Sequence, residues 1–376
     1  MEKVKAAVLV EPEKIEIQDF DRPSIQADAM LFKIELAGVC GTDVHLYHGR
    51  EKSLQYPVIL GHEFSAVISE MGEKAARTDV HGLPLETGDR ITIYNSNLCG
   101  KCYYCRFTAR QGLCPNFSVA WGFTSCRKPP HLLGAWAEYM YIFPNTWIFK
   151  VPEDMSAELN TLTEPMATAS RAIERAIMPG IPSLGEGLGP AKTVVVQGSG
   201  AIGLLSAVVA KILGAGKVIL VGAPAGRLKI SEQFNVDQVI NIEEITKPEE
   251  RINIVKRRCP LTGGADIVVE ATGVPAAVPE GIAMLRPGGT FIEVGHYVDR
   301  GTVPINPYLL CSKDINLYGS YGFSQYNMET AIHLLYDNRD KFPFEKIITH
   351  KFALYEASDA VRAAEKGEAL KSSIKP

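Results

Sequence analysis

The chain has 376 residues, enough for about two domains that each bury a core. Apolar residues make up 46% and charged residues 22%, which is ordinary globular usage and argues against disorder. The net charge of −4 argues against a basic nucleic-acid binder. No apolar run approaches the ~20 residues of a membrane span, and the charged first residues do not resemble a signal peptide. We therefore expect a soluble, cytoplasmic protein that binds neither nucleic acid nor membranes.

The two ends of the chain have the pattern of a β-rich domain. Short apolar segments at 5–10 and 30–36 predict strands, and glycine and proline interrupt the chain often up to about residue 152. After residue 321 the pattern is mixed, with helices expected near 328–336 and 357–365 and a strand near 347–352.

Strands and helices alternate in the middle of the chain. A helix is expected over 164–178, followed by strands at 193–197, 218–221, 238–241, 267–270 and 290–294, with helices at 201–213, 227–234 and 276–285. Fully apolar strands separated by helices predict an α/β fold with a doubly wound parallel sheet, as in Rossmann domains. We expect this domain over 164–321, inserted into a mostly β domain formed by 1–163 and 322–376.

A glycine-rich turn joins the first of these strands to its helix. It contains Gly198, Ser199, Gly200, Ala201, Ile202 and Gly203. Gly198 permits a tight turn, Gly200 lets the backbone approach a pyrophosphate, and Gly203 lets the helix pack close to the strand. The helix N-terminus would present free N–H groups to the phosphates. Because the motif follows a strand and opens a helix, it predicts a dinucleotide site rather than a purely structural turn.

The choice between NAD and NADP depends on the end of the next strand. An acid there normally holds the ribose hydroxyls of NAD, but this chain has Gly222. Neither Ala223 nor Pro224 offers a positive charge to a 2′-phosphate, and Arg227 is the nearest cation. Arg227 could equally begin a helix. The sequence favours NAD(H) and leaves NADP(H) open.

Four cysteines lie within sixteen residues. Their spacing is Cys99-x2-Cys102-x2-Cys105-x8-Cys114. Four thiolates close together suit a closed, tetrahedral structural zinc site better than four unrelated free thiols. Because basic and aromatic residues lie between these cysteines, a nucleic-acid-binding zinc ribbon is a second interpretation.

A second set of metal donors is spread along the chain. Cys40 and His62 offer a thiolate and an imidazole, and Glu63 and Glu164 offer carboxylates. Three protein ligands and a water molecule form the usual catalytic zinc site. From spacing alone, Cys40 could equally be a small core residue and His62 a buried, hydrogen-bonded histidine.

Taken together, these motifs resemble those of the zinc-dependent medium-chain alcohol and polyol dehydrogenases. The resemblance covers nearly the whole chain. Besides the cysteine loop, it rests on GVCGTDVH at 38–45, GHE at 61–63, EP at 164–165, GSGAIG at 198–203 and EATG at 270–273. The Glu-Pro pair is closer to the sorbitol-dehydrogenase-like branch. The family fold implied is a GroES-like catalytic domain with an inserted Rossmann domain.

The resemblance implies a role for each matching residue. Cys40 and His62 match residues that bind the catalytic zinc, Glu63 matches an acid that binds it in some members or catalytic states, and Glu164 matches the position of a third ligand. The four-cysteine loop matches the structural zinc site. Asp43 matches the carboxylate that orients the zinc histidine. Thr42 matches the hydroxyl that contacts the substrate oxygen, His45 a terminal proton acceptor, and Thr168 a residue that lines the nicotinamide. Two zinc ions per chain and a homodimer or homotetramer are expected.

The activity implied is hydride transfer between the CH–OH group of a small alcohol or polyol and NAD(P). A nucleic-acid-binding zinc module with a nucleotide-sensing Rossmann domain is one alternative, but it leaves Cys40, His62 and Asp43 unexplained. A zinc-free reductase of the same fold is another, but it would lack Cys40 and His62.

The segment 115–139 follows the cysteine loop and contains Trp121, Phe123, Arg127, Lys128 and Trp136. It could form an aromatic wall in which a cation meets an anionic substrate. A solvated surface turn is the interpretation that we favour from the sequence.

Overall fold

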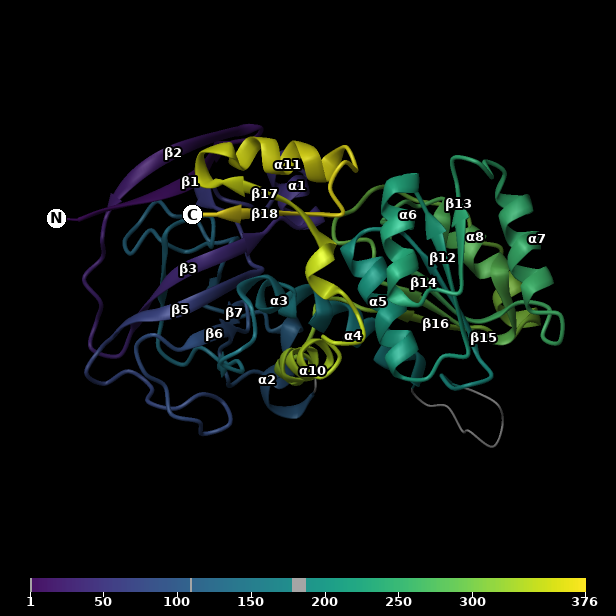
Figure 1. The fold of residues 1–376 in the computed structure, drawn as a ribbon, viewed down its shortest axis with the longest axis horizontal. Helices are drawn as coiled ribbons and strands as arrows, with labels where there is room; N and C mark the ends of the chain where they lie inside the picture. The colour runs from purple at the N-terminus through teal and green to yellow at the C-terminus, as the bar shows by residue number, and fades with distance from the viewer. Residues whose placement is uncertain (1, 109, 178–186) are drawn as a thin grey trace. The chain divides into compact units, whose positions relative to one another are not determined.

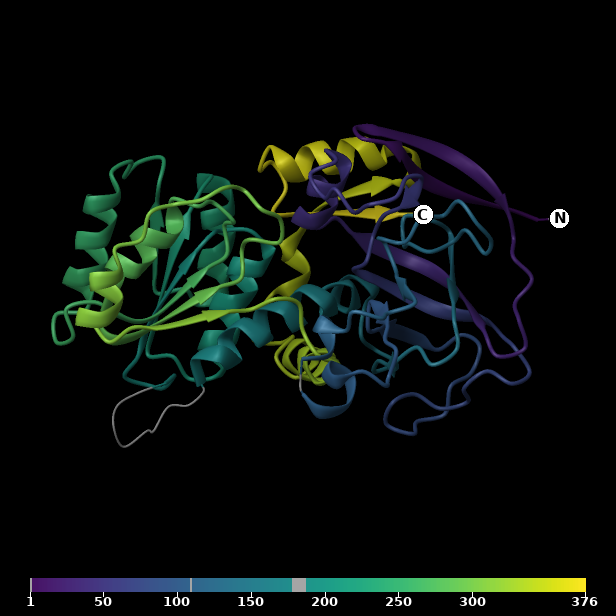
Figure 2. The same ribbon diagram turned by 180° about the vertical axis from the view of Figure 1, so that it is seen from behind.

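The computed structural model describes residues 2–108, 110–177 and 187–376, and the chain divides into two compact units. The β-rich unit contains Met1–Glu164, Ser324–Arg339 and Phe344–Pro376, and the parallel-sheet unit contains Pro165–Phe323 and Asp340–Pro343. Figures 1 and 2 show the two units from opposite sides. The expected end of the helix at Met178, before Pro179 and Gly180, lies outside the described residues.

The β-rich unit is built on an antiparallel sheet with the strand order β10-β6-β5-β3-β18-β17, in which β17 and β18 are parallel and β9 also pairs with β3. A second sheet has the order β2-β1-β4, and β7 pairs with β8. The strands are β1 (Lys3–Glu11), β2 (Lys14–Asp21), β3 (Met30–Gly38), β4 (Val58–Ile59), β5 (Phe64–Met71), β6 (Arg90–Ile93), β7 (Ser96–Asn97), β8 (Val119–Ala120), β9 (Tyr139–Ile142), β10 (Ile148–Lys150), β17 (Ile348–Ala353) and β18 (Lys371–Lys375).

Short helices cover this sheet. In α11, Ala357, Ala360 and Val361 recur at helical spacing, are fully or nearly fully buried, and face β17, β18 and α1. This packing fixes α1, the helix that follows Cys40. The helices are α1 (Gly41–Tyr47), α2 (Tyr103–Phe107), α3 (Ala157–Thr161), α10 (Gln325–Tyr336) and α11 (Ala357–Glu365), with 3₁₀ turns η1 (Gln111–Leu113), η4 (Phe344–Ile347) and η5 (Leu354–Glu356).

The parallel-sheet unit confirms the predicted doubly wound fold. Its strand order is β13-β12-β11-β14-β15-β16, and all neighbouring strands run parallel. Every residue of β11 and β14 is buried, as expected for strands covered on both faces. The strands are β11 (Thr193–Gln197), β12 (Lys217–Gly222), β13 (Gln238–Asn241), β14 (Ala265–Glu270), β15 (Leu285–Glu293) and β16 (Asn316–Gly319).

Helices lie on both sides of this sheet. Figure 1 shows α5 and α6 in front of it, and Figure 2, seen from behind, shows helices on the opposite side. The chain order reverses between β11 and β14, which is where parallel sheets of this type bind ligands, beyond the carboxyl ends of the strands. The helices are α4 (Thr163–Ile177), α5 (Ala201–Ile212), α6 (Ala225–Ser231), α7 (Pro248–Arg258), α8 (Ala277–Met284) and α9 (Pro307–Ser312), with the 3₁₀ turn η3 (Glu232–Phe234).

Several helices differ from the sequence expectation, among them α6 and α7. The helix expected over 227–234 begins at Ala225 and continues as a 3₁₀ turn from Glu232. Helix α7 was not expected, because its sequence is strongly polar. Its signals are Pro248 in the first turn and basic residues in the last turn. Among residues 2–108, 110–177 and 187–376, none of the helices has the length and apolarity that a membrane span needs.

The pair Glu35 and Arg90 links β3 to β6 across the intervening strand β5. Two guanidinium nitrogens of Arg90 lie 2.7 and 2.8 Å from the Glu35 carboxylate. Burial alone would raise the pKa of Glu35, but Arg90 and Ser65 lower it below its ordinary value of 4.5. This pair therefore stabilises the fold above pH 4.5, and its contribution is lost as the pH falls through the lowered pKa.

We expect Glu35→Gln to lower the free energy of unfolding by about 1 kcal/mol at neutral pH and to have a smaller effect as the pH falls. Urea denaturation at neutral and acidic pH measures both. An effect of Glu35→Gln that stays constant down to the lowest pH at which the protein folds would contradict this assignment.

Candidate active site

Asp43 connects the two turns that carry the candidate metal ligands. It is fully buried in the first turn of α1, and its Oδ2 accepts a hydrogen bond from the backbone N–H of Cys40 at 2.8 Å. Its Oδ1 lies 3.4 Å from the backbone N of Gly61 and 3.5 Å from Nδ1 of His62. Because Nδ1 of His62 faces Asp43, Nε2 is the nitrogen available to a metal.

Three predicted ligands lie together. One donor atom each from Cys40, His62 and Glu63 falls within 4.8 Å of the others. The topology explains this, because Cys40 follows β3 and Glu63 precedes β5, and these strands are antiparallel neighbours. A thiolate, an imidazole and a carboxylate are all zinc donors. Glu63 Oε1 is buried and has no hydrogen-bond partner among the described residues, as expected for an atom that faces an ion.

Glu164 lies beside this group rather than within it. Its Oε1 is 3.4 Å from Nδ2 of Asn95, and it is nearly buried at the start of α4. Burial, together with the nearby charge of Glu63, raises the pKa of Glu164 to about 7. Burial alone would lower the pKa of His62, but Asp43 and Cys40 raise it well above its ordinary value. These shifts show that the charges of the group interact strongly.

Lys371 is a member of this group that sequence analysis missed. It is 3% exposed, forms an ion pair with Glu63, and its Nζ lies 3.4 Å from the carbonyl oxygen of Val39. It begins β18, which runs antiparallel to β3, so it lies at the same end of the sheet as Cys40. Only the pairing of strands distant in sequence brings Lys371 here, and no local motif marks it.

The segment after the cysteine loop differs from the expected surface turn. Trp121 and Trp136 are fully buried, and their indole N–H groups donate to the carbonyl oxygens of Tyr141 and Gly38. The interpretation of a solvated turn is wrong for these residues, because both rings complete the hydrophobic core of the unit. The ring of Phe123 packs at 4.9 Å from the ring of His62. Arg127 and Lys128 are exposed, and Arg127 donates to the carbonyl oxygen of Tyr56.

Thr42 and His45, the expected proton-relay residues, both lie in α1 and are partly buried. A guanidinium nitrogen of Arg50 lies 3.0 Å from Nδ1 of His45. Since arginine can only donate, this contact requires Nδ1 of His45 to accept. The neutral ring then carries its proton on Nε2, and it can take up a second proton only at Nδ1, once the contact with Arg50 opens.

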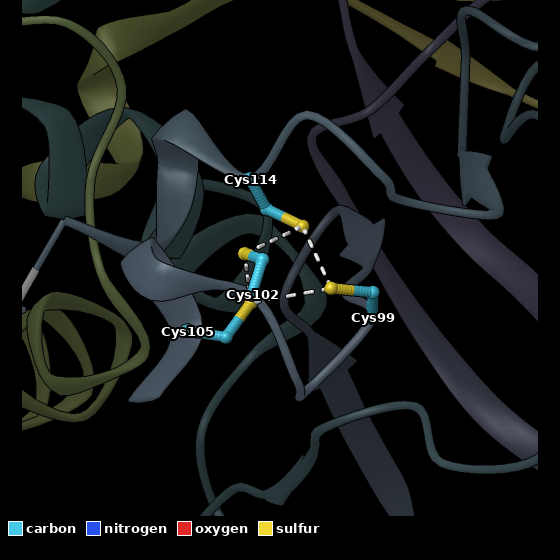
Figure 3. Close-up of side chains that lie close together, drawn as sticks. All are labelled: Cys99, Cys102, Cys105 and Cys114. Carbon is cyan, nitrogen blue, oxygen red and sulfur yellow. Dashed lines mark hydrogen bonds between the residues drawn. The ribbon is translucent and has the colours of Figure 1, made fainter. Parts of the chain in front are cut away.

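The four cysteines form a compact group (Figure 3). The sulfur–sulfur distances are 3.4 Å for Cys102 and Cys105, 3.5 Å for Cys99 and Cys114, 3.8 Å for Cys102 and Cys114, and 3.9 Å for Cys99 and Cys105. Four thiolates placed tetrahedrally at ~2.3 Å from zinc would be separated by about 3.8 Å. The loop therefore fits a zinc ion. It belongs to the β-rich unit.

We expect Cys114→Ser to remove one zinc ion per chain and to lower the melting temperature by about 10 °C, because the four-cysteine loop then loses the zinc ion that would cross-link it. Metal analysis and a thermal scan measure the two effects. Cys311→Ser is the matched control, since Cys311 is exposed. An unchanged zinc content in Cys114→Ser would contradict the structural site.

The glycine-rich turn has the geometry that a dinucleotide needs. Gly198 has a φ of +115°, and a Cβ there would lie 2.8 Å from the carbonyl oxygen of Ala271. A Cβ on Gly203 would collide with the carbonyl oxygen of Gly198, whereas the space over Gly200 is open. The open backbone at Gly200 and the start of α5 at Ala201 leave N–H groups available to phosphate.

The packing at the end of β12 explains why glycine, rather than an acidic residue, occupies position 222. A Cβ on Gly222 would lie 2.7 Å from Oγ of Ser199, which itself donates to the carbonyl oxygen of Ala223 at 2.7 Å. An acidic side chain would therefore collide with Ser199 at this position. Arg227 is partly buried in the first turn of α6, where burial lowers its pKa. Thr168 is partly buried in α4.

Comparison with known families decides the class. Residues 26–153 match the alcohol dehydrogenase GroES-like domain, and residues 201–337 match the zinc-binding dehydrogenase domain. The chain belongs to the zinc-binding dehydrogenase family. It is an oxidoreductase of the class that acts on CH–OH donors, as the motifs predicted. The match supports this interpretation over the nucleic-acid-binding alternative.

Similar dehydrogenases are known from several organisms. An alcohol dehydrogenase from Thermotoga maritima has a TM-score of 0.91 and 31% identity, with all of both chains covered. D-xylulose reductase A from Aspergillus oryzae is 29% identical, over 96% of this chain and 93% of its own length. A putative zinc-binding dehydrogenase from Sinorhizobium meliloti, solved with NADP bound, has a TM-score of 0.85 and 25% identity, with both chains fully covered.

Proposed function

We propose that this zinc-binding dehydrogenase interconverts a small alcohol or polyol and its carbonyl compound, with NAD(P) as the hydride carrier and two zinc ions per chain. Cys40, His62, Glu63 and Glu164 would hold or flank the catalytic ion, and the four-cysteine loop would hold the structural one. The observation that carries this proposal is the group of donor atoms from Cys40, His62 and Glu63 within 4.8 Å, fixed by the buried Asp43.

The residues of the chain have separate tasks. When bound, the catalytic zinc would act as a Lewis acid on the substrate oxygen, and the nicotinamide would exchange the hydride. The Thr42 hydroxyl would take the proton of the substrate hydroxyl and pass it toward His45. Asp43 would hold the ring of His62 in one orientation. Phe123, packed on His62, would limit the access of water to that ring.

We expect His45→Gln to lower turnover mainly at low pH, by about 10- to 100-fold, because glutamine cannot accept a proton. Rate profiles against pH for the variant and the parent protein measure this effect. If the two profiles have the same shape, His45 is not part of the relay.

The preferred cofactor is proposed as NAD(H), with Thr168 near its nicotinamide and Arg227 near its ribose. Because a side chain at Gly222 would collide with Ser199, other residues near the end of β12 would have to bind the ribose. Titration of the protein with NADH and NADPH, followed by nicotinamide fluorescence, decides the preference. Tighter binding of NADPH would assign Arg227 to a 2′-phosphate instead.

A panel of alcohols and polyols, together with metal analysis, tests the reaction itself. Two zinc ions per chain and oxidation of a CH–OH donor support the proposal. One zinc ion per chain, with no oxidation of any alcohol in the panel, would favour a reductase of the same fold that lacks the catalytic zinc ion.

We also propose a homodimer or homotetramer that works in the cytoplasm. Strand β16 is the edge of the parallel sheet, and its Leu317 is 46% exposed. An edge strand of this kind can pair with a second chain. Light scattering on the purified protein measures the number of subunits.

A further inference from the structure

A second cluster of titratable groups lies in the parallel-sheet unit. Glu270 ends β14 and Glu293 ends β15, and His296 follows three residues later. Nδ1 of His296 lies 2.9 Å from Oε1 of Glu293 and 3.5 Å from Oε2 of Glu270. Glu270 is fully buried, while Glu293 and His296 are partly exposed. The three groups therefore meet at the carboxyl end of two neighbouring parallel strands.

Hydrogen bonds connect the members of this cluster to one another and to their loops. At 2.9 Å, His296 and Glu293 are at hydrogen-bond distance, with the ring N–H donating to the carboxylate. The other carboxylate is held by its own loop, because Oε1 of Glu270 accepts from the backbone N–H groups of Thr272 at 2.7 Å and Gly273 at 3.1 Å. Oε2 of Glu293 is buried and has no hydrogen-bond partner among the described residues. Glu293 therefore has an unused acceptor inside the cluster.

The position of the cluster in the sheet places it near the expected site of the nicotinamide half of the cofactor. The glycine-rich turn after β11 would bind the pyrophosphate, and the end of β12 would take the adenosine ribose. The other mononucleotide must then lie over the ends of β14 and β15, across the point where the strand order reverses. The turn after Glu270 is also tied to β11, because the N–H of Ala271 donates to the carbonyl oxygen of Gln197 at 2.8 Å.

The charge of this cluster changes near neutral pH. Burial of Glu270, together with the neighbouring carboxylate of Glu293, raises the pKa of Glu270 to about 7. Arg300, which donates to the carbonyl oxygen of Gly273, is the nearby cation. As the pH rises through about 7, Glu270 loses its proton and the cluster gains one negative charge.

The two redox forms of the cofactor differ in the charge of the ring. The nicotinamide ring is positive in the oxidised cofactor and neutral in the reduced one. A negative charge beside the ring stabilises the first form and leaves the second nearly unaffected.

We propose that Glu270, Glu293 and His296 form a charge cluster that sets the relative affinity of this unit for oxidised and reduced nicotinamide cofactors. This inference rests on the proposed nicotinamide cofactor. The three side chains act as positioning residues, since they change the electrostatic potential at the ring rather than react. By linkage, binding of the oxidised cofactor promotes loss of the proton of the cluster, and binding of the reduced cofactor does not.

Dissociation constants of NAD⁺ and NADH for the full-length protein, measured by calorimetry at about one pH unit below and above 7, test this proposal. In the parent protein, the affinity for NAD⁺ relative to NADH should rise about tenfold across this range. In Glu293→Gln, the pKa of Glu270 loses the repulsion from its neighbour, so this rise should shift to lower pH.

Glu249→Gln is the matched control, because Glu249 is exposed in α7 and the substitution removes the same charge. This control should keep the pH dependence of the parent protein. A relative affinity that does not change with pH, or one that changes identically in Glu293→Gln and the parent, overturns the inference. Failure to bind either redox form would instead overturn the proposed function and, with it, the inference.

Discussion

Cys40→Ser is expected to lower turnover by about a thousandfold or more and to reduce the zinc content from two ions per chain to one. The thiolate of Cys40 is one of the three donors within 4.8 Å, and serine is a much poorer zinc ligand. Losing the ion removes several kcal/mol of charge stabilisation in the transition state, which corresponds to this factor. Steady-state kinetics and metal analysis measure the two effects.

Cys311→Ser is again the control, because Cys311 is exposed and lies in the other unit. It should keep both zinc ions and full activity. Retained activity in Cys40→Ser would refute the assignment of the catalytic ion. Loss of activity with two zinc ions still bound would show that Cys40 acts in some other way.

Lys371→Met is expected to lower the free energy of unfolding by about 3–5 kcal/mol. The variant removes the ion-pair partner of Glu63 from a buried site, so the carboxylate keeps only the charge of His62 nearby. Both side chains are at most 3% exposed, so water cannot replace the lost partner. Urea denaturation of the metal-free protein measures the loss without the stabilisation that bound zinc adds.

The double variant Glu63→Gln/Lys371→Met separates this explanation from a simple packing defect. Because neither side chain is then charged, most of the lost stability should return. If the double variant is as unstable as Lys371→Met alone, the ion pair is not the cause. A loss below about 1 kcal/mol in the single variant would show that Lys371 is not buried with Glu63.

Local motifs predicted the centre of the parallel-sheet unit, although not α7, α9 or the edge strand β16. The apolar segment 193–197, the glycine-rich turn and the following helix all occur as predicted, with the helix ending one residue earlier, at Ile212. These elements depend on interactions between residues close in sequence, so periodicity and turn chemistry reveal them. The same holds for the four cysteines, whose spacing alone predicts their convergence.

Contacts between distant segments could not be predicted in this way. Lys371 reaches Glu63 only because β18 pairs with β3, and His296 meets Glu270 only because β14 and β15 are neighbours. The two tryptophans were misjudged for a related reason. Trp121 and Trp136 occur among glycine, proline and charged residues, which is typical of a surface turn, yet the sheets of the β-rich unit enclose both. Composition describes the neighbours in sequence, whereas burial depends on neighbours in space.

The pairing of Lys371 with Glu63 also constrains how the protein is assembled during synthesis. Cys40, His62 and Glu63 leave the ribosome early, the whole parallel-sheet unit is made next, and Lys371 emerges only afterwards. Until β18 docks against β3, the nascent ligand cluster carries an uncompensated carboxylate and an incomplete sheet edge. The candidate metal group can therefore reach its final electrostatic balance only after residue 371 has been made, so a fragment that lacks β18 should differ from the full chain in its affinity for zinc.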